Sequence, residues 1–141
     1  MEVNVNYLAV FLAAVTSMVV GSVWYAPGVL GTTWARLAKV NMKRQPGKYE
    51  MVRLLGTTFI ISLVTAYVLA HVIFLSNNFF QNNYLQDALT TAFWLWLGIN
   101  AVRFWTHDMF ESRPGKLTLI TVSNELVTLM VMALVIGLLK P

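Results

Sequence analysis

The chain has 141 residues, of which 57% are hydrophobic and only 11% are charged, and its formal net charge is +4. A water-soluble domain of this length cannot cover so many apolar side chains with so few charged ones, so lipid is the expected solvent for most of the chain. The absence of cysteine excludes disulfides, thiolate metal sites and cysteine nucleophiles. The positive charge does not indicate nucleic-acid binding, because the basic residues follow the pattern of membrane-protein loops.

Four segments are apolar enough to cross the hydrocarbon core, which requires about 20 residues in a helix. The first carries no charged residue, and the last contains one acidic residue, Glu125. No connecting segment is long enough to form a second domain. The sequence therefore predicts an all-α, polytopic integral membrane protein with one domain and four transmembrane helices. The expected spans are residues 5–26, 52–75, 88–105 and 117–139.

Lysine and arginine are distributed unevenly among the connections. The segment between the second and third spans, SNNFFQNNY, has neither, whereas the other two connections are basic. By the positive-inside rule, these two basic connections lie in the cytoplasm and both termini lie outside, in a multi-pass protein of the cell (inner or plasma) membrane. The basic residues that carry this prediction are Arg36, Lys39, Lys43, Arg44 and Lys48 in the first connection, and Arg103, Arg113 and Lys116 around the third.

The stretch GSVWYAPGVLGTTW closes the first span with an unusual concentration of aromatic residues. Trp24 and Tyr25 lie where amphipathic rings prefer the lipid headgroups, and Pro27 then ends the helix. Residues 29–43 predict a short helix on the cytoplasmic membrane surface, with Trp34 on its apolar face and basic residues on the other. We interpret Trp24, Tyr25 and Trp34 as interface anchors; an aromatic binding box is the alternative.

Small residues recur every four positions in the first two spans. This spacing lets two helix backbones approach closely, so we expect these residues to form the packing seams of both helices. The seams consist of Ala9, Ala13, Ser17 and Gly21 in the first span, and of Ser62, Ala66 and Ala70 in the second.

Glu125 lies about eight residues into the fourth span, which places it about 12 Å below the cytoplasmic boundary at 1.5 Å per residue. A carboxylate at this depth costs about 2.5 kcal/mol or more unless it has a partner or a proton. Arg103 lies near the cytoplasmic end of the third span, so an Arg103–Glu125 ion pair is the expected contact. The alternative is that Arg103 reaches the lipid headgroups instead and leaves Glu125 alone and protonated. The candidate intramembrane polar network consists of Glu125, Arg103, Asn100, His107, Thr121 and Thr128.

Two interpretations of this network remain open. It is either a structural pair that fixes the register of two helices, or a protonatable carboxylate that serves a proton- or ion-coupled path.

The sequence carries no recognisable catalytic, cofactor or haem motif, and we expect no cofactor and no metal site. The two histidines, His71 and His107, lie at opposite membrane faces in the predicted topology. His107, Asp108 and Glu111 are compatible with a weak cytoplasmic cation site, but a solvated helix end is the favoured interpretation.

Two motifs together resemble a known family. GSVWYAPGVLGTTW and FESRPGKLTLITVSNELV are similar to segments of the small four-helix bacterial membrane proteins grouped as Domain of Unknown Function 1761. The first helix of that family ends in a G-x-x-W-Y-x-P pattern, followed by G-x-x-x-W or a close variant; here the last Trp is one position closer. An acidic-Arg-Pro turn before the last helix corresponds to Glu111, Arg113 and Pro114. The resemblance implies the fold and the membrane location, and no activity.

Two functions are compatible with these features. The first is a small non-enzymatic membrane protein, an accessory or scaffold that forms a homo-oligomer or joins a larger membrane complex. The alternative is a minimal proton- or ion-coupled transporter or channel protomer that uses the Glu125/Arg103 network and closes its path as an oligomer. A membrane-embedded enzyme ranks last, because no catalytic group is recognisable.

Overall fold

The computed structural model describes residues 3–41, 44 and 46–141. Within these residues the secondary structure is helical throughout, and no strand occurs. The elements in chain order are α1 (Tyr7–Trp24), the π-helical turn η1 (Pro27–Gly31), α2 (Thr32–Leu37), α3 (Lys48–Phe80), α4 (Tyr84–Leu95), the π-helical turn η2 (Trp96–Ala101), α5 (Val102–Phe110) and α6 (Gly115–Leu139).

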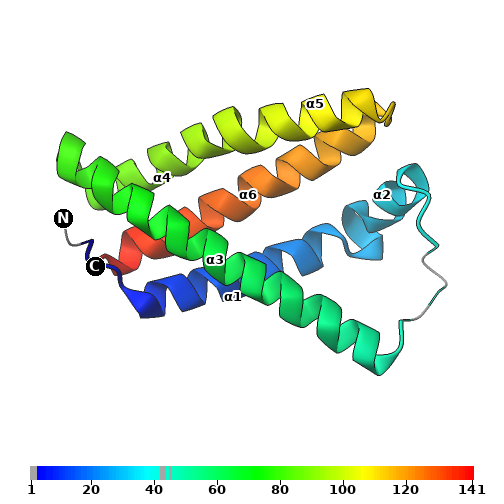
Figure 1. Cartoon of the computed structure of the whole chain (residues 1–141), viewed down its shortest axis with the longest axis horizontal. Coiled ribbons are helices and arrows are strands. Elements are labelled where there is room, and N and C mark those ends of the chain that lie inside the picture. The colour runs from blue at the N-terminus through cyan, green and yellow to red at the C-terminus, as the bar shows by residue number, and fades with distance from the viewer. Residues whose placement is uncertain (1–2, 42–43, 45) are drawn as a thin grey trace.

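Helix α6 is the central element of the bundle. It contacts α1, α2, α3, α4 and α5, and it lies antiparallel to the rod that α4, η2 and α5 form together (Figure 1). The N- and C-terminal ends of the chain lie at the same end of the molecule, as an even number of long antiparallel segments requires (Figure 1).

Three helices, α1, α3 and α6, are long and apolar enough to cross a membrane. The expected third span, residues 88–105, lies inside the rod of α4, η2 and α5, in which a π-helical turn separates two shorter α-helices. Helix α3 is 33 residues long and exceeds the expected span of residues 52–75 at both ends. At 1.5 Å per residue it measures about 50 Å, well beyond a hydrocarbon core of about 30 Å.

The hydrophobic core lies in the half of the bundle that contains the termini. Its fully covered residues are mostly small, which lets α1, α3, α4 and α6 approach closely. The core consists of Val10, Ala13, Ala66, Leu69, Ala70, Ile73, Ala88, Ala92, Leu129, Met132, Ala133 and Ile136.

The expected packing seams are confirmed in this half of the bundle. Ala9, Ala13 and Ser17 of α1 are buried, and so are Ala66 and Ala70 of α3. The seam of α1 does not extend to its last member, since Gly21 has no neighbouring atom within 4 Å of the place a Cβ would take. A close contact that the seams did not predict joins α6 to α4: a Cβ on Gly137 would lie 3.1 Å from the Cα of Leu85.

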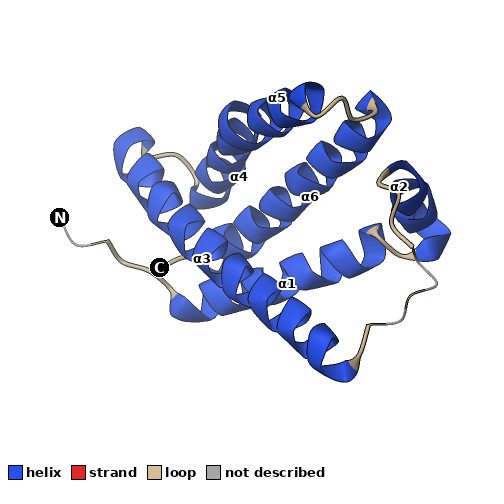
Figure 2. Cartoon of the chain, turned by 45° about the vertical axis from the view of Figure 1, so that its right-hand side comes forward, coloured by secondary structure: helices blue, strands red, loops and turns tan. Residues whose placement is uncertain are grey.

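The opposite half of the bundle is open. Every residue of α3 from Met51 to Thr58 is exposed, and its first buried residue is Ala66. Helix α5 buries only Asp108. Figure 2 shows the first half of α3 running away from the ends of α5 and α6. The four long segments therefore pack against one another at one end and diverge at the other.

The expected surface helix over residues 29–43 is shorter in the structure. Helix α2 ends at Leu37, and Lys39 takes the left-handed conformation with φ 56°. The amide of Val40 donates to the carbonyl of Ala35 and that of Lys39 to Arg36, which is the Schellman arrangement that closes a helix. The prediction did not anticipate this end because the position after the cap is usually glycine. Lys43, expected on the polar face, lies outside the described residues.

Candidate functional site

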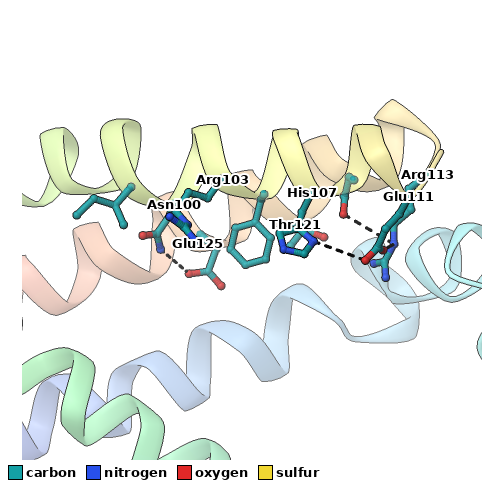
Figure 3. Close-up of a pocket in the computed structure, with 10 residues that line it drawn as sticks. Asn100, Arg103, His107, Glu111, Arg113, Thr121 and Glu125 are labelled. Carbon is teal, nitrogen blue, oxygen red and sulfur yellow. Dashed lines mark hydrogen bonds and ion pairs between the residues drawn. The ribbon is translucent and has the colours of Figure 1, made fainter.

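The π-helical turn η2 places Asn100 opposite Glu125 of α6. A π-helical turn accommodates one residue more than an α-helical turn, and such turns occur frequently at functional sites. The Asn100 amide Nδ2 donates to Glu125 Oε2 over 3.1 Å, and Figure 3 shows the two side chains pointing toward each other. The indole Nε1 of Trp96, the first residue of η2, donates to the carbonyl of Val122 over 2.9 Å. Two hydrogen bonds therefore attach η2 to α6 at this level.

Tyr25, the residue that caps the end of α1, lies near this site. Its side chain is within electrostatic range of Glu125 and lies beside the side chain of Thr121. Its ring packs edge-on against Trp34 of α2, with the ring centroids 5.2 Å apart. Tyr25, Trp24 and Trp34 are all half-buried, and Tyr25 connects the end of α1 and α2 to the site on α6.

Gly31 makes this arrangement of α1 and α2 sterically feasible. The chain reverses through η1, and the amide of Gly31 donates to the carbonyl of Ala26 five residues earlier. A Cβ at this position would lie 2.1 Å from the carbonyl oxygen of Tyr25, so no other residue fits without moving the turn. The glycine thereby allows Trp34 to pack against Tyr25.

An open groove of about 590 Å³ lies beside these residues. Its wall comes from η2, α5, the start of α6 and the connection between α5 and α6. The lining residues are Ile99, Asn100, Arg103, Phe104, His107, Asp108, Glu111, Arg113, Thr121 and Glu125. Five of the six residues expected in the polar network therefore line one groove: Glu125, Asn100, Arg103, His107 and Thr121. Thr128 does not line it.

The expected Arg103–Glu125 ion pair does not form. Among the described residues, Arg103 takes part in none of the ion pairs, and Asn100 is the side chain that bonds the carboxylate. Arg103 follows η2, and the extra residue of that turn shifts its register relative to a regular α-helix. Its side chain is exposed rather than directed onto Glu125.

The charged residues at the mouth of the groove neutralise one another. The Arg113 guanidinium lies 2.6 Å from Glu111 and 3.8 Å from Asp108, and His107 lies 3.6 Å from Glu111. Asp108, which is buried, also accepts a hydrogen bond of 2.7 Å from Thr118. These carboxylates therefore hold the connection between α5 and α6 in place. The described residues contain no group of three or more acidic or histidine side chains that could hold a metal ion.

Two contacts were missing from the sequence prediction, those of Tyr25 and of Thr118. Tyr25 was assigned to the headgroup region, although α1 and α6 are antiparallel and Tyr25 lies at the inner end of its helix. The predicted depths, with Tyr25 at the boundary and Glu125 about 12 Å below it, gave no sign of this contact. Thr118 carried no signal either, and the structure directs its hydroxyl to Asp108.

Comparisons with known proteins identify the family but no characterised relative. Neither the curated proteins nor the solved structures contain a match to this chain. One protein family matches residues 8–137, nearly the whole chain, and its description is "Protein of unknown function (DUF1761)". The resemblance seen in the two sequence motifs is thereby confirmed: the chain belongs to DUF1761.

Proposed function

We propose that this protein is a small, non-enzymatic component of the cell membrane that works as an oligomer, with four membrane crossings. The fourth crossing is the rod of α4, η2 and α5, in which no single α-helix is long enough to cross because η2 interrupts it. It spans residues 84–110 without a break in the helical backbone, and at about 1.5 Å per residue it is long enough to cross.

One observation carries the proposal: the groove that contains Glu125 is open. Its lining comes from η2, α5, α6 and their connection, with no contribution from α3. A carboxylate inside a membrane is costly when it faces lipid, and such residues face a bundle interior or another chain. A second copy of the protein packed along the open half would cover this groove.

The exposed half of α3 is the surface that we assign to this contact. From Met51 to Thr58 all sides of the helix are uncovered, although the same helix is firmly packed from Ala66 onward. Lipid would be enough to cover the apolar residues of this segment. The segment also presents Arg53, Gly56 and Thr57, and small or polar residues are common at contacts between membrane helices.

Cysteine crosslinking in native membranes tests the oligomer. The chain contains no cysteine, so any crosslink must form through the single cysteine that is introduced. Leu55→Cys in the unpacked half of α3 should form disulfide-linked dimers under mild oxidation. Val68→Cys, exposed on the packed half of the same helix, is the matched control and should not. A monomeric mass in nanodiscs, together with equal crosslinking at both positions, would contradict the proposal.

A second function, a proton- or ion-coupled transport protomer, is favoured by one specific observation. The π-helical turn η2 holds Asn100 against an intramembrane carboxylate, and both π-helical turns and buried carboxylates are typical of functional sites in membrane proteins. In proteoliposomes, Glu125→Gln should abolish a wild-type ion flux while the protein remains folded, and Glu50→Gln, outside the groove, should leave it unchanged. Wild-type vesicles that pass no ion would remove this candidate.

A further inference from the structure

The charges that line the groove divide into two sets. Those at the mouth are mutually satisfied, because Arg113 and His107 contact Glu111, and Arg113 also contacts Asp108. Those further inside are not: Arg103 is in no ion pair among the described residues, and Glu125 has an amide partner but no cation. The inner groove therefore presents one positive and one negative group, each without a counter-charge.

We propose that this groove binds a small zwitterion, with its ammonium group at Glu125 and its anionic group at Arg103. The ligand would supply both missing counter-charges at once. The oligomer is not required for this site, since every residue that lines the groove belongs to one chain.

The order of the two charges along the groove determines the orientation of the ligand. Arg103 follows Asn100 by three residues, an axial step of about 4.5 Å at 1.5 Å per residue, and it lies on the side of the mouth. Asn100 marks the level of Glu125 through their hydrogen bond. The ammonium group therefore enters first. Amino acids and phosphoethanolamine are small molecules that carry both charges.

The rest of the lining suits such a ligand. A volume of about 590 Å³ is within the usual range for small-molecule sites, about 300 to 1,000 Å³. Ile99 and Phe104 provide apolar contacts, and the face of an aromatic ring attracts an ammonium group. Thr121, whose hydroxyl donates to the carbonyl of Leu117 over 3.2 Å, keeps lone pairs available as an acceptor.

Ligands of a single charge fit less well. An anion bound at Arg103 would lie beside the carboxylate of Glu125, and a cation at Glu125 would lie beside the guanidinium of Arg103. Both arrangements bring like charges together in surroundings that screen them poorly. The groove thus distinguishes a zwitterion from the separate ions.

Thermal unfolding in nanodiscs provides the test, with O-phosphoethanolamine as the probe and choline and inorganic phosphate as single-charge controls. In nanodiscs of phosphatidylglycerol alone, millimolar O-phosphoethanolamine should raise the unfolding temperature of the wild type, and the two controls should not. Arg103→Gln and Glu125→Gln should each weaken the probe's apparent affinity at least tenfold. Arg36→Gln, which removes an exposed arginine of α2 outside the groove, should bind as the wild type does.

A second set of nanodiscs separates the two sources of this chemistry. If a lipid headgroup is the natural ligand, adding phosphatidylethanolamine to the bilayer should itself stabilise the protein and abolish the response to the soluble probe. If the natural ligand is soluble, the response should persist. Both results support a zwitterion site. The zwitterion site would be overturned if neither source stabilises the protein, or if Arg103→Gln leaves the response to the probe unchanged. Arg103 is exposed, so Arg103→Gln should fold even if Glu125→Gln does not.

Discussion

Asn100 and Glu125 are joined across two helices by a hydrogen bond of 3.1 Å, from the amide Nδ2 to the carboxylate Oε2. Asn100 belongs to the π-helical turn η2 and Glu125 to the central helix α6. The bond couples the only interruption in the rod of residues 84–110 to the acidic residue within the last span. Arg103, the expected partner, is left without an ion pair among the described residues.

A double-mutant cycle separates these two relationships. Asn100→Leu should lower the free energy of unfolding by about 1 kcal/mol, because hydrogen bonds between membrane helices contribute about 0.6 to 2 kcal/mol. Combined with Glu125→Leu, which removes the acceptor, its effect should be non-additive, since the residues are in contact. Arg103→Leu with Glu125→Leu is the control cycle and should be additive. Coupling in the Arg103 cycle alone would show that the ion pair, and not the amide, stabilises the carboxylate.

Gly31 should tolerate no side chain. Gly31→Ala places a Cβ 2.1 Å from the carbonyl oxygen of Tyr25, and relieving this overlap should cost about 1 to 3 kcal/mol of stability. Gly28→Ala, in the same turn, meets no atom within 4 Å and serves as the matched control. Thermal unfolding of both variants in nanodiscs measures the difference. Equal unfolding temperatures would contradict the geometry of η1.

A buried carboxylate, Asp87, should stabilise the other end of the bundle. Its two oxygens accept hydrogen bonds from the amides of Asn77, over 2.7 Å, and Asn82, over 3.0 Å. Asp87→Ala removes the acceptor of the Asn82 amide and one of the two acceptors of the Asn77 amide, which should cost about 1 to 3 kcal/mol. Asn78→Ala, an exposed neighbour, should have little effect. If both substitutions are equally mild in denaturation experiments, the polar cluster does not hold α3 to α4.

Asn124 should behave in the opposite way. Its Nδ2 is buried and has no hydrogen-bond partner among the described residues. A buried donor without a partner is unfavourable, so Asn124→Leu, of similar size, should raise the free energy of unfolding by about 1 kcal/mol. The measurement is equilibrium unfolding beside the wild type. A lower stability would mean that the amide finds a partner in the membrane, such as water or a second chain.

Cysteine labelling should show that the interrupted rod crosses the membrane. In intact cells a membrane-impermeant maleimide should label Asn78→Cys, near the end of α3, but not Lys116→Cys, at the start of α6. Permeabilised cells should show label at both. The two sites flank residues 84–110, so labelling of both in intact cells would place the rod on the membrane surface.

Much of the fold followed from local features of the sequence. Composition and apolar run length predicted helices in lipid, because backbone groups there must be satisfied within a segment. The spacing of Ala13 and Ser17 predicted close packing, since residues four apart share a helix face. The unusual depth of Glu125 marked it as a candidate site, and its groove contains Asn100, Arg103, His107 and Thr121 as neighbours.

Other features depended on how distant segments meet. A π-helical turn decides whether Asn100 or Arg103 contacts Glu125. The periodicity of the sequence gives no signal for such a turn. The proximity of Tyr25 to Glu125 depends on how α1 crosses α6. The early end of α2 depends on the left-handed conformation of Lys39. The sequence by itself determined the apolar helices, since these follow from residues close in the chain. Only the tertiary structure decided the partners of Glu125, because these come from separate segments.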